Sequence, residues 1–415
     1  MAAGESTNPV SSTPNGCQIH RGKTFSNSLD AIKMALLGLI PEPPFDPSSW
    51  SGSSTNFFQA LDRAGLLTSA REVSLSRSRD SLEKTTSFSL PMRRWKARYH
   101  SSVRRFKALT DVAGRIIAEQ QEAAAVLQIG AWFSGGSASE LPCFSYHDGN
   151  AALRYRFYGR GLLGSKAVQA HLNWERSVYK SLRGIFVMSE WLADSFMKDF
   201  GVPRTKLHVV GAGINMEMPV TNAHRKWSSP RYLLVGKDFE RKGGRHLLQA
   251  FEEVRRAIPD AELIIVGPNL QIQQPGVQIA GFLSKNSPDG IGRLNEIFSA
   301  ATTMVLPSIY EPFGISLLEG MAHGLPCIAV DRCAMPEIVR HGDTGLIARA
   351  ENAHSLAEAM IHIGKSPDDA IRMGAAGRRR VESEFTWDAV VRKMSAVLSN
   401  TYGILSLTTR LRASQ

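Results

Sequence analysis

The sequence predicts an α/β fold of two Rossmann-like domains, each a parallel sheet covered by helices, that face each other across a cleft. Short apolar runs alternate with amphipathic helical segments along most of the chain, which is typical of parallel sheets covered on both faces. The alternation occurs in two series, separated by residues 216–230, which carry no periodic pattern. The length of 415 residues suits two domains of about 100–200 residues each.

The first series is expected to form an N-terminal domain over residues 30–215. Residues 1–29 are rich in Ser, Thr, Asn, Pro and Gly and are predicted to be a disordered tail. Residues 68–90 are polar with weak strand signals, and residues 93 to about 121 are predicted to be helical. The other predicted strands are 34–40, 124–131, 141–149, 184–189 and 206–213, and the other helices are 55–67, 166–182 and 190–201.

The second series is expected to form a C-terminal domain over residues 231–384, after a linker at 216–230. Ligands of such sheets bind outside the carboxyl ends of the strands, so the loops that follow the strands are the expected site. The predicted strands are 231–236, 261–267, 277–282, 302–308 and 326–331, and the helices are 243–258, 290–300 and 315–324.

Composition and charge restrict the function classes. Apolar residues make up 43% of the chain and charged residues 21%, which excludes collagen-like, low-complexity and wholly disordered proteins. The four scattered cysteines do not suit a disulfide scaffold or a cysteine zinc site, and they favour a reducing, cytoplasmic setting. The formal net charge, 49 − 38 = +11, predicts an anionic partner, which is nucleic acid, acidic lipid or a phosphorylated small molecule.

The stretch LPSIYEPFGISLLEG carries the strongest chemical signal. It places Glu311 in a loop at the carboxyl end of a strand and Glu319 inside the following helix. The amides of Phe313, Gly314 and Ile315 are expected to be free at the helix N-terminus, where the dipole favours an anion. Carboxylates accept hydrogen bonds from sugar hydroxyls, and acids take the ribose diol in dinucleotide folds. The pattern predicts a site for a nucleotide joined to a sugar through phosphates.

Two lysines follow the first strand of the C-terminal series. Lys237 and Lys242 bracket its loop, and two fixed cations there would neutralise a diphosphate leaving group without a metal. His147 and Asp148 follow an N-terminal strand, but no other His, Cys or carboxylate lies at ligand spacing, so no metal site is expected.

These motifs resemble the retaining family 4 glycosyltransferases of the GT-B fold. The family's Glu-x7-Glu motif is matched by Glu311 and Glu319, and its basic pair by Lys237 and Lys242. The stretches MAHGLPCIAVD and PEIVRHGDTGLI match the residues that usually follow this motif in the family. The resemblance is strong from 231 to about 388, fair from 141 to 215 and weak before 124.

The resemblance implies a function. The protein would transfer a hexosyl group, with retention, from a UDP- or GDP-linked nucleotide sugar to a glycan or lipid-linked acceptor. The C-terminal domain would bind the donor and the N-terminal domain the acceptor. No further cofactor and no metal are expected. The protein is expected to act in the synthesis of cell-surface polysaccharides or glycolipids. The segment 385–415 is expected to form a helix that returns to the N-terminal domain.

The resemblance also implies residue roles. Glu311 would bind the donor sugar near the reacting carbon, Glu319 the ribose, and Lys237 and Lys242 the diphosphate. The amides at 313–315 would contact the sugar and phosphate. Gly52, in the first strand–helix loop, would let the backbone approach the phosphates, and His147 would donate a hydrogen bond near the reacting sugar. The catalytic set is therefore predicted to be His147, Glu311 and Lys242.

Two positions depart from the family pattern. The first basic residue is usually arginine, and Lys237 lacks the planar fork that grips phosphate oxygens in two places. The first loop usually carries paired glycines, whereas here Gly52 stands alone near Trp50. These departures concern the donor's identity and the phosphate contact from the N-terminal domain.

Two functions of other classes stay open. One is a catalytically silent nucleotide-sugar binding protein on the same fold. The other is a basic nucleic-acid-binding protein, although no known nucleic-acid module is present and nucleic acid is not expected as a partner.

The basic stretch 93–107 has three interpretations. Its eight Lys and Arg residues could bind an anionic membrane surface, with Trp95, Tyr99 and Phe106 as anchors at the interface, which would make the protein peripheral on the inner face of the membrane. The same residues could bind nucleic acid. They also fit an ordinary helix with one solvated and one packed face.

Overall fold

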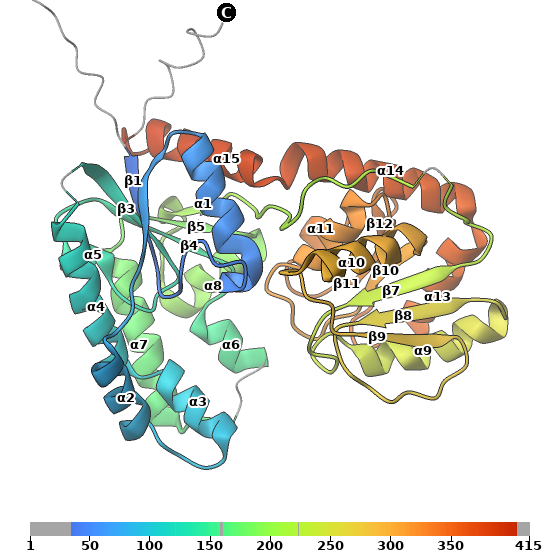
Figure 1. Cartoon of the computed structure of the whole chain (residues 1–415), viewed down its shortest axis with the longest axis horizontal. Coiled ribbons are helices and arrows are strands. Elements are labelled where there is room, and N and C mark those ends of the chain that lie inside the picture. Colours follow the sequence, from blue (N-terminus) through green and yellow to red (C-terminus); the bar gives the residue numbers. More distant parts are fainter. Residues whose placement is uncertain (1–34, 121, 158–160, 223, 405–415) are drawn as a thin grey trace, which may run out of the picture. The chain divides into compact units, whose positions relative to one another are not determined.

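The computed structural model describes residues 35–120, 122–157, 161–222 and 224–404. These residues belong to one compact unit, which contains two six-stranded sheets flanked by helices (Figure 1). The strand pairings in both sheets are parallel. The predicted fold class is therefore confirmed. The predicted tail, residues 1–29, lies outside the described residues.

The N-terminal sheet has the strand order β2-β1-β3-β4-β5-β6. Its strands are β1 (Ala35–Ile40), β2 (Leu67–Glu72), β3 (Ala123–Ile129), β4 (Cys143–His147), β5 (Gly184–Val187) and β6 (Leu207–Val209). Its helices are α1 (Ser53–Arg63), α2 (Arg77–Thr86), α3 (Met92–His100), α4 (Val103–Ala118), α5 (Gly135–Ala138), α6 (Ala151–Phe157), α7 (Ser165–Ser181) and α8 (Glu190–Phe200). Strands β4 and β5 are buried along their whole length, because helices cover both faces of the sheet.

Two features of this half go beyond the sequence predictions. Residues 68–90 hold most of β2, in agreement with their weak strand signals, and also α2, which is not predicted. The stretch predicted to be helical, from 93 to about 121, is divided into two helices, α3 and α4. Both differences begin at serines. The hydroxyl of Ser102 accepts a hydrogen bond from the amide of Arg105 and starts α4, and Ser76 caps α2 in the same way. Apolar periodicity does not reveal such a restart, because the cap acts through a polar side chain.

The C-terminal sheet has the strand order β12-β11-β10-β7-β8-β9. Its strands are β7 (Arg231–Val235), β8 (Glu262–Val266), β9 (Val277–Gly281), β10 (Thr303–Leu306), β11 (Cys327–Val330) and β12 (Gly345–Ala348). Its helices are α9 (Gly244–Ala257), α10 (Pro288–Ala300), α11 (Ile315–Ala322), α12 (Met335–Ile338), α13 (Ala353–Lys365), α14 (Pro367–Glu384) and α15 (Trp387–Asn400).

The order of this sheet reverses between β7 and β10. Strands β8 and β9 continue on one side of β7, while β10 lies on its other side, with Tyr232 opposite Thr303 and Leu233 opposite Met304. At such a switch point the loops that follow the two strands diverge and leave room for a ligand. The loop after β7 carries Lys242 and the loop after β10 carries Glu311, so the fold itself brings the predicted site residues to one place.

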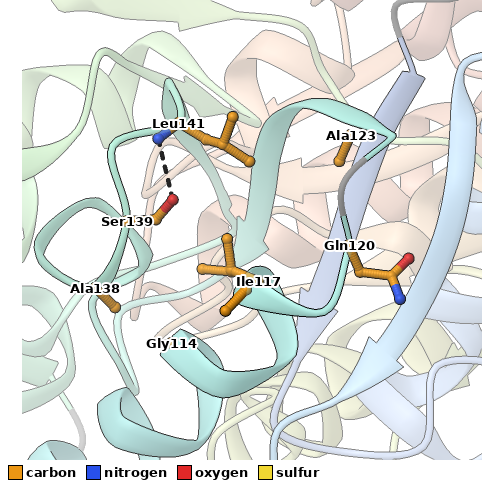
Figure 2. A pocket seen from close by; sticks show the side chains of 8 residues that line it. Gly114, Ile117, Gln120, Ala123, Ala138, Ser139 and Leu141 are labelled. Carbon is orange, nitrogen blue, oxygen red and sulfur yellow. Dashed lines mark hydrogen bonds between the residues drawn. The ribbon is translucent and has the colours of Figure 1, made fainter.

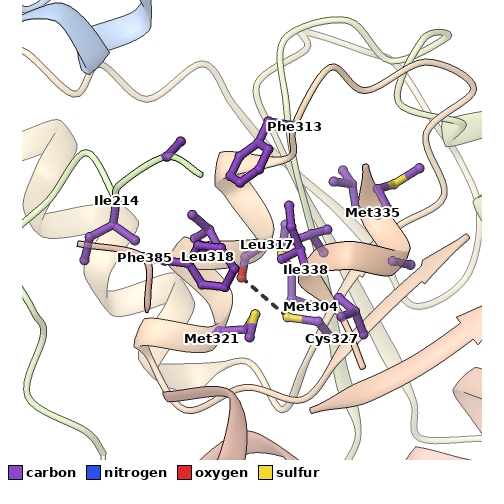
Figure 3. Packing of buried hydrophobic residues seen from close by; sticks show 14 of the residues in the cluster. Ile214, Met304, Phe313, Leu317, Leu318, Met321, Cys327, Met335, Ile338 and Phe385 are labelled. Carbon is purple, nitrogen blue, oxygen red and sulfur yellow. Dashed lines mark hydrogen bonds between the residues drawn. The ribbon is translucent and has the colours of Figure 1, made fainter. Parts of the chain in front are cut away.

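Helix α11 lies deep in the core of the C-terminal half. Leu317, Leu318 and Met321 are fully buried, and they pack with Ile338 and Phe385 in the cluster of Figure 3. A helix that is apolar on most of its surface must be surrounded by protein. The two polar groups at its start and middle, the N-terminal amides and Glu319, are therefore held on a rigid support.

The last helix, α15, contacts the N-terminal half of the chain. Trp387 packs against Phe57 of α1 with 5.6 Å between ring centroids, and its indole Nε1 donates to Oδ1 of Asn215 at 3.0 Å. Farther on, Tyr402 packs against Phe144 of β4. Among the described residues, none of the helices combines the length and apolarity that crossing a membrane requires.

Gly243, which caps the start of α9, provides a test of the loop between β7 and α9. Its φ is 73°, and a Cβ at this position would overlap the carbonyl oxygen of Pro307. We expect Gly243→Ala to lower the free energy of unfolding by about 2 kcal/mol or more, measured by urea denaturation.

The matched control is Gly292→Ala in α10, where an added Cβ meets nothing within 4 Å. Because alanine favours helix over glycine, this variant should gain up to about 1 kcal/mol. Equal unfolding midpoints for the two variants would contradict the close approach of the loop to β10.

Candidate active site

The loops that follow β7 and β10 are tied together by backbone and side chain. The amide of Ile309 donates to the carbonyl oxygen of Arg241 at 2.9 Å. The guanidinium of Arg241 donates in turn to the carbonyl oxygen of Tyr310 at 2.8 Å. These two bonds fix the separation of the loops, so the side chains that follow in each loop meet in a defined geometry.

Lys242 and Glu311 meet in a buried ion pair. Lys242 Nζ lies 2.6 Å from Glu311 Oε2, and each residue is 7% exposed. The hydroxyl of Ser308 donates to the same oxygen at 3.2 Å, and Arg241 Nη1 lies 3.5 Å from it. Burial alone would raise the pKa of Glu311, but the charges of Lys242 and Arg241 outweigh it and lower that pKa below its ordinary value. Glu311 is therefore an ionised carboxylate with two cations beside it.

Gly236 explains why Lys242 can reach into the protein. A Cβ at position 236 would lie 2.7 Å from Cε of Lys242 and in contact with the rest of its stem. The absence of a side chain after β7 therefore opens the channel through which the lysine stem passes.

The start of α11 has the properties of an anion site. Gly314 caps the helix with a φ of 106°, and no side chain caps the first turn. Phe313 is 4% exposed and packs toward Phe385, which holds the approach to the helix in place. In the first turn, the buried Oγ of Ser316 has no hydrogen-bond partner among the described residues. Amide donors and the helix dipole therefore point outward beside the Lys242–Glu311 pair.

Glu319 lies inside α11 and is almost fully buried. Its carboxylate is bound by the ammonium group of Lys285, which extends from the loop after β9. Lys285 was not predicted from the sequence. The FLSKNS stretch has no motif, and only the position of β9 in the sheet shows that its loop reaches this helix.

Lys237 is not brought together with Lys242 and Glu311. Its side chain is exposed, and its Nζ lies 4.8 Å from the ring centroid of Phe282. Phe282 belongs to the same loop as Lys285. The loop that starts at residue 282 thus contacts both Lys237 and Glu319.

In the N-terminal half, Gly52 ends a left-handed turn. Trp50, Ser51 and Gly52 have φ angles of 44°, 57° and 87°, a strained run for two residues with side chains. The Nδ2 atom of Asn215 holds the turn by donating to the carbonyl oxygen of Ser51 at 3.1 Å and to Oγ of Ser53 at 2.9 Å. Gly52 caps α1 without a side-chain hydrogen bond. Its contact with a phosphate stays a prediction.

His147 ends β4 with its imidazole inside the protein. The ring is packed against Tyr179 and Phe196, and its Nε2 bonds with Oγ of Ser145 at 2.8 Å. Burial lowers the pKa of His147 to about 3, so the ring is neutral near pH 7. The structure thus gives the predicted catalytic imidazole a partner within its own strand.

Asp148, the next residue, has no role in the sequence prediction, which expects no metal site at His147 and Asp148. Its Oδ2 accepts a hydrogen bond from Nε1 of Trp50 at 3.0 Å. Burial raises the pKa of Asp148, and the charge of Glu311 adds to the rise. Among the described residues, no cluster of His, Cys, Asp and Glu suits a metal ion.

A separate small cavity of about 320 Å³ lies beside α4 (Figure 2). Its lining includes Gly114, Ile117 and Leu141, and the amide of Leu141 donates to Oγ of Ser139 at 3.0 Å. The lining holds no titratable side chain, so nothing in it adds to the chemistry of the site.

The fold is that of the GT-B class of glycosyltransferases, as predicted. Sucrose-phosphate synthase from Thermosynechococcus elongatus aligns with a TM-score of 0.65 at 17% sequence identity, over 89% of this chain and 100% of that chain. At this identity the likeness concerns the fold alone.

Sequence comparisons add similarities in the C-terminal half. Residues 222–380 match the family model described as glycosyl transferases group 1. Alpha-maltose-1-phosphate synthase of Mycolicibacterium smegmatis is 28% identical over 242 residues, which is 51% of this chain and 62% of that protein. A GDP-mannose-dependent alpha-(1-6)-phosphatidylinositol monomannoside mannosyltransferase of Mycobacterium tuberculosis is 27% identical over 232 residues, 51% of this chain and 60% of that protein.

The matched region thus spans about three fifths of the length of these relatives. The predicted resemblance to the glycosyltransferases is confirmed over the matched residues.

The lowered pKa of Glu311 makes the stability of the fold depend on pH. Because the folded-state pKa lies below its ordinary value of 4.5, the ionised carboxylate stabilises the fold above about pH 5, and this contribution is lost as the pH falls through the lowered pKa. The difference in unfolding free energy between wild type and Glu311→Gln should therefore be largest near neutral pH and shrink below about pH 4, as measured by urea denaturation.

Glu240→Gln serves as the control, because Glu240 forms an ion pair with Arg245 at the surface, where such pairs contribute little. A difference for Glu311→Gln that does not change with pH would contradict the ionised state of this carboxylate.

Proposed function

We propose that this protein is a retaining glycosyltransferase. It transfers a hexosyl group from a UDP- or GDP-linked nucleotide sugar to a hydroxyl of a glycan or lipid-linked acceptor. The observation that carries the proposal is the buried Lys242–Glu311 pair at the switch point of the C-terminal sheet, beside the uncapped start of α11. The match of residues 222–380 to the glycosyl transferases group 1 model supports it.

Each residue of this site has a proposed task. Lys242 stabilises the diphosphate as negative charge develops on it, and Arg241, 3.5 Å from the same carboxylate, is the second cation within reach. The amides at the start of α11 bind phosphate oxygens. Glu311 accepts hydrogen bonds from hydroxyls of the donor sugar, and Glu319 accepts them from the ribose when Lys285 yields to the diol.

The reaction exchanges one bond to the anomeric carbon for another. The bond from that carbon to the phosphate oxygen breaks, and a bond to the acceptor oxygen forms on the same face of the sugar. The proton of the acceptor hydroxyl passes to the departing phosphate. Cations that neutralise the diphosphate supply the electrostatic stabilisation without a metal. Glu311, with its lowered pKa, stays ionised throughout and orients the sugar.

The N-terminal half supplies the acceptor side in this proposal. Because the imidazole of His147 bonds with Ser145, we assign its contribution to the backbone at the end of β4. Gly52 contributes its backbone at the start of α1. We place the protein on the cytoplasmic side, where it acts in cell-surface polysaccharide or glycolipid synthesis; one relative is named for a phosphatidylinositol-linked acceptor.

Ligand-dependent thermal unfolding tests the donor site. UDP, GDP and ADP and their sugars, each added in EDTA at about 100 times the dissociation constant, should stabilise the protein by roughly 2.7 kcal/mol if they bind. We expect a shift with the uridine or the guanosine compounds and none with the others. No shift with any nucleotide, together with binding to nucleic acid that falls steeply with salt, would overturn the proposal in favour of the nucleic-acid-binding protein.

Loss of the Glu311 charge separates a transferase from a silent binding protein. With the nucleotide sugar identified by unfolding, wild type should release nucleoside diphosphate, because water replaces the acceptor slowly. Glu311→Gln should lower this release about 100-fold while nucleoside diphosphate still binds.

The control for this experiment is Glu240→Gln, at a surface ion pair, which should keep both activities. Absence of release by the wild type, with or without added glycan and lipid acceptors, would identify a silent nucleotide-sugar binding protein. Loss of nucleotide binding by Glu311→Gln would assign the residue to the nucleotide instead of the sugar.

A further inference from the structure

The basic stretch 93–107 divides between a packed and an exposed face. Phe106 is fully buried, with Trp132 and Trp174 around its ring, so this predicted membrane anchor belongs to the core. Trp95 is only partly buried, and its indole donates to the carbonyl oxygen of Lys84. The charged side chains of α3, by contrast, are exposed. Packing thus accounts for Phe106 but not for the concentration of positive charge.

Part of that charge lines a groove of about 550 Å³ between α3, the start of α4 and the start of α7. Four cations line it, namely Arg94, Arg98, Arg104 and Lys166, together with four hydroxyl side chains and no acid. The groove lies within the range of volumes that small-ligand sites occupy. Cations and hydroxyls gathered in one groove without an acid in its lining favour an anion with several oxygen atoms.

Three of the four cations have no acidic partner among the described residues. Arg94 and Arg98 are one helical turn apart on α3, a like-charge spacing that destabilises a helix. Neither they nor Lys166 forms an ion pair with any described residue. Arg104 is fixed in place, because its Nε donates to the carboxylate of the buried Glu83 at 2.9 Å. One rigid and three free cations therefore surround the hollow, and a bound anion would relieve their repulsion.

Exposed apolar side chains lie just before α3 and at its first residue. Phe88, Leu90 and Met92 are 59%, 75% and 54% exposed, an unusual concentration next to a charged groove. Such residues enter the boundary between headgroups and acyl chains when an anionic surface is bound. We propose that the groove binds the phosphorylated headgroup of an anionic phospholipid, with Phe88, Leu90 and Met92 inserted beside it. This site is separate from the donor site and does not depend on the proposed transfer.

Vesicle sedimentation tests the proposal with the full-length protein. Wild type should bind vesicles of phosphatidylcholine with phosphatidylglycerol and not vesicles of phosphatidylcholine alone, and added salt should release it. Because each cation near an anionic surface contributes about fivefold to binding, Arg94→Gln with Arg98→Gln should weaken binding about 30-fold. The control is Arg256→Gln with Arg379→Gln, which removes the same charge from α9 and α14 and should leave binding unchanged.

A second variant separates a lipid from a free phosphate. Leu90→Ser should weaken vesicle binding while the soluble headgroup glycerol phosphate, followed by calorimetry, binds as it does to wild type. Equal loss in the two charge-matched variants would show attraction by net charge alone and overturn the proposal. Binding of glycerol phosphate without binding of vesicles would assign the groove to a soluble phosphate compound, and binding of nucleic acid that the α3 variant alone loses would assign it to that polymer. Vesicle binding that Leu90→Ser does not weaken would exclude the insertion of this side chain.

Discussion

The ion pair between Lys242 and Glu311 is the contact on which the arrangement of the site depends. Removing an ammonium and a carboxylate from water carries a desolvation cost that only good geometry and further hydrogen bonds offset. Here Ser308 and Arg241 supply them. Because the partners come from loops after two adjacent strands, neither loop can shift without leaving a buried charge unpaired. The pair therefore acts together with the two hydrogen bonds of Arg241 to hold the loops at one separation, and the space beside the pair has a defined shape before a ligand enters.

The groups around this pair fall into a rigid and an adjustable set. Lys242, Glu311 and Glu319 are buried on or beside α9 and α11, and α11 is enclosed by the core. Lys237 and Lys285 are exposed to a greater degree and extend from loops. Rigid groups define where charge can be stabilised, because they need no reorganisation. Adjustable cations can follow a ligand that enters and leaves, since their long stems keep many rotamers.

Much of this arrangement follows from the sequence because it rests on local pattern. Alternating apolar runs predict the two parallel sheets, and the position of a residue just after a strand predicts that Glu311 and Lys242 meet at one edge. What the sequence does not predict depends on contacts between distant segments. The bond from Lys285 to Glu319 joins residues 34 positions apart, and the pattern of apolar residues does not predict it. The imidazole of His147 turns to Ser145 because aromatic rings from α7 and α8 cover that face of β4.

Polar capping explains the other differences. The serines that start α2 and α4 begin helices that apolar spacing does not show, because a hydroxyl that binds a backbone amide begins a new helix regardless of the periodicity around it. Apolar periodicity likewise does not predict where the basic side chains of α3 lie in the folded protein. Two of these side chains, Arg94 and Arg98, line a groove that is completed by Gly164 and Lys166, which are far along the chain.

The side-chain amide of Asn215 links the first loop to the last helix, and this link bears on the order in which the protein folds during synthesis. Its nitrogen holds the left-handed turn after β1, and its oxygen accepts from Trp387 in the last helix. During synthesis on the ribosome, β1 and α1 emerge several hundred residues before Trp387 does. Until then the oxygen of this amide lacks its partner, which fixes the orientation of the amide in the finished protein. The N-terminal sheet can assemble early, but the full set of hydrogen bonds around the first loop forms only when the chain is almost complete, and an N-terminal half produced alone would lack the bond from Trp387.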